Sequence, residues 1–185
     1  MLWAMMVPPS VDAIGEVPGW RSRSGFIAAY LVLWTAFGLA SFFLDLGIHA
    51  TVNHSPWLSL HPWVISGAIL IVAGAYQLST AKTSSLAACR RLVHSGGQQA
   101  SGWRPAFGSG LAYGLRCLGA NWALMLLAFA LATGSLVVMG ILTALMAVEV
   151  AGPWSTWLVR LSGYAMVAVA AVVLVGPING LLWLG

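Results

Sequence analysis

The chain has 185 residues, of which 60% are hydrophobic and only 6% are charged. Soluble domains carry about a quarter charged residues, so this composition indicates an integral membrane protein. Eight Lys and Arg stand against four Asp and Glu, and these few scattered charges exclude a basic surface that binds nucleic acid. The presence of only two cysteines excludes a disulfide framework.

The apolar segments predict one integral membrane domain over residues 1–185, an all-α transmembrane helix bundle with about five spans. Each crossing of the hydrocarbon core takes about 20 residues. Residues 1–24 are expected to form an N-terminal stub and loop, because the apolar segment 2–7 is too short to cross. The predicted spans are 25–46, 62–78, 107–132, 134–151 and 157–183.

Cations are unevenly distributed between the predicted spans. Two precede the first span, four lie between the second and third, and segment 47–61 has none. The positive-inside rule then predicts a cytoplasmic N-terminus, with segment 47–61 and the C-terminus outside. The four cations between the second and third spans are expected to mark this topology and to contact anionic lipid headgroups: Lys82, Arg90, Arg91 and Arg104.

One ion pair is predicted from depth in the membrane. Only residues 132–134 separate the third and fourth spans, so these spans are expected to form an antiparallel hairpin. Arg116 lies 17 residues before Thr133 and Glu149 lies 16 residues after it, which places both about 25 Å from the turn. Because an unpaired charge at that depth is costly, we predict a structural ion pair between Arg116 and Glu149.

Small residues spaced by four predict close contacts between helices. In the third and fourth spans these are Gly110, Gly114, Gly140 and Ala144. Asn121 is expected to assist this packing, because amide side chains hydrogen-bond between transmembrane helices.

A stripe of polar side chains runs along the third span, where Tyr113, Cys117, Ala120 and Asn121 share one helix face. This stripe could line a cofactor pocket. A thiol, an amide and a phenol nevertheless supply fewer ligands than transition-metal sites use. The simpler interpretation is that Tyr113 and Asn121 hydrogen-bond to neighbouring helices and that Cys117 packs as a small apolar residue.

Two further groups are candidate metal ligands. His49, His54 and His61 lie close together in sequence, and imidazoles can bind Cu or Zn, but their spacing matches no ligand motif and interfacial or capping roles are the alternative. Cys89 lies among arginines that favour a reactive thiol, but it has no partner cysteine nearby in sequence. No catalytic triad, pair of carboxylates or phosphate-binding loop supports an enzyme.

Several motifs together resemble a known family. They are AMMVPPS from Ala4, AYLVLWTAFG from Ala29, AGAYQLSTAK from Ala73, SLAACR from Ser85 and GLAYGLRCLGANWALM from Gly110. In this order they resemble a bacterial domain-of-unknown-function family of predicted metal-binding integral membrane proteins. The similarity covers about Ala4 to Glu149. It implies a multi-pass protein of the bacterial cytoplasmic (inner) membrane, and a helix that usually precedes the AMM motif is expected to be absent.

The departures from this family fall on its expected metal ligands. Ser85 replaces the first Cys of the family's CLxxCR motif, and Tyr113 replaces a His. Ala120 and Asn121 replace two adjacent Cys. The resemblance therefore implies a degenerate site in which Cys89 and Cys117 remain, with Met5 and Met6 as further soft ligands.

The leading hypothesis from sequence is a non-catalytic accessory or scaffolding subunit of a larger bacterial membrane complex, in contact with membrane lipids and other membrane protein subunits. The alternative is copper binding, trafficking or sensing in the membrane by soft ligands that select Cu(I). Its candidate ligands are Met5, Met6, Cys89, Cys117, His49, His54 and His61. A third hypothesis is a small redox or quinone-linked enzyme, and bound lipid or pigment is a further candidate.

Overall fold

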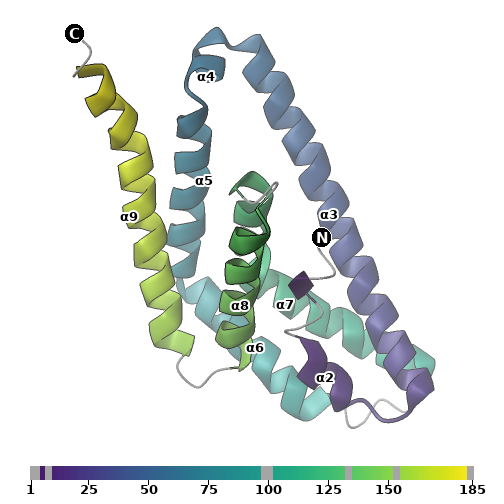
Figure 1. Cartoon of the computed structure of the whole chain (residues 1–185). Coiled ribbons are helices and arrows are strands. Elements are labelled where there is room, and N and C mark those ends of the chain that lie inside the picture. Colours follow the sequence, from purple (N-terminus) through teal and green to yellow (C-terminus); the bar gives the residue numbers. More distant parts are fainter. Residues whose placement is uncertain (1–4, 7–9, 97–101, 132–134, 152–154, 183–185) are drawn as a thin grey trace.

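The computed structural model describes residues 5–6, 10–96, 102–131, 135–151 and 155–182. The regular elements within these ranges are helices, which confirms the predicted all-α class (Figure 1). They are α2 (Val11–Gly15), α3 (Trp20–His54), α4 (Pro56–Leu60), α5 (Pro62–Gln77), α6 (Thr80–Gly96), α7 (Trp103–Leu131), α8 (Leu136–Ala151) and α9 (Ser155–Leu182).

Three of these helices, α3, α7 and α9, are long and apolar enough to cross a membrane. The pair α5 and α6 passes the same test together, although the two helices are bent by 61° at their junction, and α8 is a shorter apolar helix. The described residues thus supply three candidate spans, or four if the bent pair counts as one. This is compatible with a membrane protein, while the count of about five spans is not confirmed and the orientation of the termini stays a prediction.

Helix α3 is longer than the predicted first span at both ends. It has 35 residues and includes most of the segment that was expected to form an outer loop. It stops where Ser55 adopts an extended conformation before Pro56, because a proline disfavours the helical conformation of the residue before it. Figure 1 shows α4 joining the C-terminal end of α3 to the start of α5 at the top of the view, and the two helices diverge from this end downward.

The segment between the second and third predicted spans, for which no span was predicted, contains a helix, α6. Its start is defined by Ser79, whose Oγ accepts a hydrogen bond from the Lys82 amide at 3.2 Å and donates one to the Tyr76 carbonyl at 2.6 Å. A serine oxygen that accepts from the third amide of a helix is a standard N-cap. The chain therefore changes direction at this cap, where α5 ends and α6 begins.

Helix α7 is at the centre of the fold, since it contacts α3, α5, α6 and α8, while α9 packs mainly on α5. In Figure 1, α3 and α9 lie on opposite sides of the molecule, with α5 and α8 between them. The main buried cluster contains side chains from the N-terminal methionines, α3, α5, α6, α7, α8 and α9. The core therefore forms around α7.

The predicted small-residue contacts are correct for α7 and wrong for α8. A Cβ added at Gly110 would lie 2.5 Å from the Phe26 carbonyl oxygen, and one at Gly114 would lie 2.8 Å from Leu33, so both glycines allow α3 and α7 to approach closely. Gly140 has no atom within 4 Å of an added Cβ, and both Gly140 and Ala144 are exposed. These two residues therefore lie on the outer face of α8. The prediction failed for them because a spacing of four residues identifies one face of a helix but does not say whether that face is buried.

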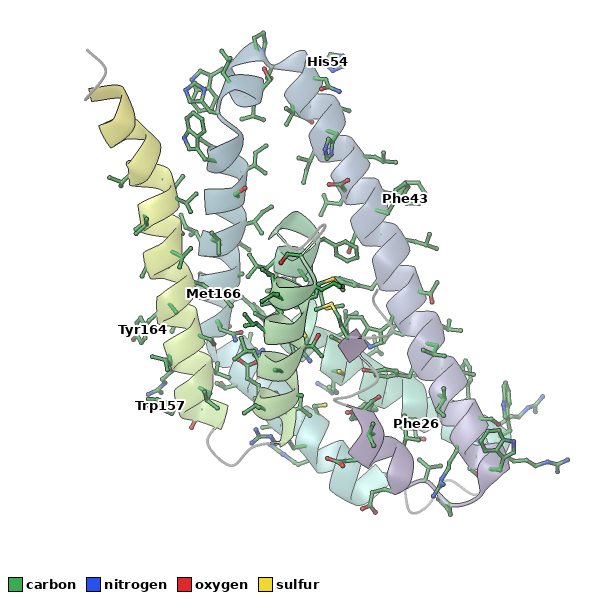
Figure 2. The ribbon with its side chains drawn as sticks, in the orientation of Figure 1. Phe26, Phe43, His54, Trp157, Tyr164 and Met166 are labelled. Atoms are coloured by element: carbon green, nitrogen blue, oxygen red, sulfur yellow. The ribbon has the colours of Figure 1, made fainter. Side chains whose placement is uncertain are left out.

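The outer faces of α3 and α9 are apolar. Phe43 on α3 and Tyr164 on α9 are 66% and 63% exposed, and Figure 2 shows both side chains pointing away from the bundle. Phe26, by contrast, is 4% exposed and faces α7, where its ring lies 5.5 Å from that of Tyr113. Apolar outer faces are typical of helices that are surrounded by lipid.

Candidate metal centre

Two cysteines from different helices meet in the core. Cys89 on α6 and Cys117 on α7 are both free thiols with 0% exposure, and their side chains lie within hydrogen-bonding reach of each other. Lys82, Leu86 and Cys89 recur at helical spacing and are all buried, so they form the face of α6 that packs against its neighbours. Because this segment lies outside the predicted spans, the sequence did not predict the contact between the two thiols.

Tyr30 on α3 connects this thiol pair to the N-terminal methionines. Its Oη donates a hydrogen bond to the Met6 carbonyl at 3.0 Å and lies 3.5 Å from Cys117 Sγ. In this second contact either the hydroxyl or the thiol can be the donor. Met5 and Met6 are only 2% and 1% exposed and belong to the same core cluster as both cysteines. The methionine pair is thus part of the core around the thiols.

The other polar residues of α7 also surround the thiols. The Tyr113 hydroxyl lies within hydrogen-bonding reach of Cys89 on α6, which agrees with the predicted contact to a neighbouring helix. Asn121 behaves differently from the prediction, since its Nδ2 donates to the Cys117 carbonyl at 3.1 Å and lies 3.6 Å from Cys117 Sγ, both on its own helix. Within the part of the chain that the structure describes, the hydrogen bonds of the Asn121 side chain stay on α7 and orient Cys117.

The positions that depart from the resembling family gather at the same contact between α6 and α7. A Cβ added at Gly119 on α7 would lie 3.2 Å from Ser85 Oγ on α6, so Ser85 faces α7. The Ala120 carbonyl accepts a hydrogen bond from Lys82 Nζ. Of the four positions, Tyr113 and Asn121 are the ones that lie beside the two thiols.

The three histidines lie far from this place. The Nδ1 atoms of His49, His54 and His61 are each 2.7 to 3.0 Å from the backbone carbonyl four residues earlier, and His49 Nδ1 is also 3.4 Å from the exposed Asp45 carboxylate. Along α3, His49 is 19 residues beyond Tyr30, a distance of about 28 Å. Figure 2 shows His54 at the far end of α3. The histidines therefore do not contribute to the thiol site.

The predicted Arg116–Glu149 ion pair is wrong. Glu149 is fully buried and its Oε2 lies 2.8 Å from Lys82 Nζ, which is also fully buried, whereas Arg116 is exposed. Glu149 Oε1 also accepts hydrogen bonds from Gln77 Nε2 and Ser162 Oγ. Counting residues from the turn gave Arg116 and Glu149 similar positions along their helix axes. It could not give the direction in which either side chain points. Arg116 directly precedes Cys117, so on the helix its side chain points about 100° away from that of Cys117.

The donors in this core favour one class of metal. No group of three or more His, Cys, Asp and Glu side chains that could hold a metal ion occurs in the described part of the chain. Zinc sites usually have four ligands of these types, so a zinc site is not supported by these residues. Two thiols with thioethers in the same core are soft sulfur ligands, and these select Cu(I).

The fold and the paired thiols define an all-α protein with three or four candidate membrane-spanning helices and soft sulfur ligands in its core. A family model described as "PpoB2: Copper chaperone" matches residues 1–173, and the chain belongs to this family. No curated protein and no solved structure matches the chain. The family description fits the copper alternative from the sequence. The accessory-subunit hypothesis gains no support from it.

Proposed function

We propose that this chain binds monovalent copper within the membrane and passes it to an acceptor, with Cys89 and Cys117 as the ligands. The observation that carries the proposal is the meeting of two buried thiols from α6 and α7. The copper chaperone family supports copper as the metal. Copper is here the cargo of the protein.

The chemistry of Cu(I) fits this pair. Thiolates and thioethers are soft ligands that select Cu(I) over harder divalent ions, and both thiols give up their protons when the metal binds. Two thiolates on facing helices can hold the ion in a two-coordinate arrangement. Met5 and Met6 supply thioethers within the same core. Burial of all four side chains keeps bound Cu(I) away from water and oxidants.

Two strong ligands also suit a protein that must release its metal. A sulfur ligand of an acceptor can add to a two-coordinate Cu(I) ion before either thiolate leaves, so the ion need never be free. A closed site with four strong ligands, as in structural zinc centres, offers no open position for this exchange. The loss of four expected ligand positions is then consistent with a transfer site that has few ligands.

Copper titration of the detergent-purified full chain tests the proposal. Cu(I) is added under anaerobic, reducing conditions against a competing Cu(I) chelator, and X-ray absorption identifies the bound ligands. We expect one Cu(I) per chain with sulfur ligands, and loss of binding in C89S/C117S. The matched control is Met166→Leu, which removes a buried sulfur on α9.

Two results would overturn the proposal. One is a wild-type chain that competes for no Cu(I), and the other is a C89S/C117S chain that holds copper as tightly as the wild type. Copurification of other subunits with a copper-free chain would instead favour the accessory-subunit hypothesis.

A further inference from the structure

The proposed copper ligands cannot be reached from the surface in this conformation, because Cys89 and Cys117 are both 0% exposed. Transfer of Cu(I) to an acceptor requires that a sulfur atom of the acceptor reaches the bound ion. Some part of the chain must therefore move aside. Elements that open locally in folded proteins are those with few buried contacts of their own.

The N-terminal part of the chain covers Cys117. The Met6 carbonyl accepts a hydrogen bond from Tyr30 Oη at 3.0 Å, and the same hydroxyl lies 3.5 Å from Cys117 Sγ. We call Met5, Met6 and residues 10–17 the N-terminal cover. Four of its side chains are buried in the cluster that also holds both cysteines: Met5, Met6, Ala13 and Val17.

Helix α2, which lies within this cover, is the shortest kind of helical element. It has five residues and its main contacts are with α3 and α6, and Figure 1 shows it beside the lower part of α3. Helices below about 12 residues are marginal in water unless they pack against other elements. The position of α2 therefore depends on the few interactions that attach it.

The connection between α2 and α3 contains a hinge at Gly19. This residue has φ 77° and ψ 149°, a backbone conformation that is essentially restricted to glycine. A Cβ added at Gly19 would meet no atom within 4 Å. Glycine is thus required here by the turn of the backbone and not by close packing.

Arg23, in the first turn of α3, ties the cover back across this turn. Its Nε donates a hydrogen bond to the Val17 carbonyl at 2.8 Å, and its Nη2 donates one to the Gly15 carbonyl at 3.2 Å. Both carbonyls lie at the C-terminal end of α2, where carbonyls lack partners within the helix and a cation is favourable. Because Arg23 is exposed, water competes for these bonds and their net strength is modest.

We infer that the N-terminal cover is a lid over the proposed copper site, with Gly19 as its hinge and Arg23 as its latch. When both hydrogen bonds of Arg23 break, α2 rotates about Gly19 and the cover leaves Tyr30, which exposes Cys117. Helix α3 stays in place, since it packs closely on α7. The inference rests on the proposed function, because it describes how bound Cu(I) reaches an acceptor.

Alkylation of the metal-free, detergent-purified full chain tests the lid without copper. N-ethylmaleimide is added under native conditions, and mass spectrometry follows the modification of each cysteine over time. Arg23→Gln removes the latch, and Gly19→Ala strains the hinge in the closed conformation. The matched control is Arg21→Gln, which removes an exposed cation two residues away on the same helix. Thermal unfolding of each variant reports its global stability.

We expect Cys117 to be alkylated about 5–10-fold faster in R23Q than in the wild type. This factor corresponds to the loss of one or two hydrogen bonds of ordinary net strength, because modification follows the population of the open state. G19A is also alkylated faster, and R21Q keeps the wild-type rate. Copper-loaded R23Q passes Cu(I) to a chelator faster than the wild type, with the same stoichiometry.

Two results would overturn the lid. One is alkylation of Cys117 in R23Q at the wild-type rate. The other is an increase that disappears when the chains are compared at equal distances below their unfolding temperatures, since this would show a general loosening of the fold. If alkylation responds as expected in a chain that binds no Cu(I), the lid stands and the proposed function is overturned.

Discussion

Tyr30 Oη lies 3.5 Å from Cys117 Sγ and donates its proton to the Met6 carbonyl, so one hydroxyl joins α3, α7 and the N-terminal methionines. Tyr30→Phe removes this link and leaves the ring packing in place. We expect a loss of about 1 kcal/mol, the usual net value of one hydrogen bond, together with weaker Cu(I) binding and faster alkylation of Cys117. Alkylation of native protein followed by mass spectrometry measures the last effect. Alkylation at the wild-type rate would contradict the proposed role of this hydroxyl.

The Lys82–Glu149 pair predicts unequal effects of single and double substitutions on stability. Lys82→Met alone leaves a buried carboxylate without its cation, which costs about 3–5 kcal/mol in comparable cases. The double variant K82M/E149L removes both charges and is expected to unfold near the wild-type temperature. Thermal unfolding in detergent, followed by circular dichroism, measures both. Equal destabilisation of the single and double variants would mean that the two charges are not coupled.

The glycines of α7 and α8 provide a matched pair of substitutions. Gly110→Leu places a side chain against the Phe26 backbone, where a Cβ alone would lie 2.5 Å from the carbonyl oxygen, whereas Gly140→Leu enters open space. We expect G110L to cost about 1–3 kcal/mol or more, as overpacked cores do, and G140L to leave the unfolding temperature of the chain unchanged. If G140L destabilises the purified chain as much as G110L, the described packing of α8 is wrong.

The positions of the three histidines predict that their removal leaves Cu(I) binding unchanged. The variant H49A/H54A/H61A removes three side chains that lie about 28 Å or more along the chain's helices from the Tyr30 contact with Cys117. We expect its Cu(I) affinity and stoichiometry to equal those of the wild type in the chelator competition. A lower stoichiometry in this variant would reveal a second copper site on the α3 and α4 end of the molecule.

Several features were predictable from residue patterns alone. The apolar composition predicted an all-α chain, because a backbone in lipid must satisfy its own hydrogen bonds within helices. The resemblance to a metal-binding membrane family predicted Cys89, Cys117 and the methionine pair as sulfur ligands. The structure buries all four side chains in one core cluster, while their role as ligands stays a prediction. Small-residue spacing correctly marked Gly110 and Gly114 at the contact between α3 and α7.

Other features depended on packing between helices that are distant in sequence. The polar α6 was not predicted from hydropathy, because hydropathy averages over all faces of a helix. Only its packing on α7 shows that Cys89 and Lys82 point inward. Glu149 was paired with the wrong cation because counting residues gives height along a helix but not direction around it. Residue types thus determined that this core holds soft sulfur and a buried charge pair. The angles at which α6, α7 and α8 pack decided that the two thiols meet and that Lys82, not Arg116, pairs with Glu149. These angles depend on contacts between helices that are distant in sequence, so residue types alone do not give them.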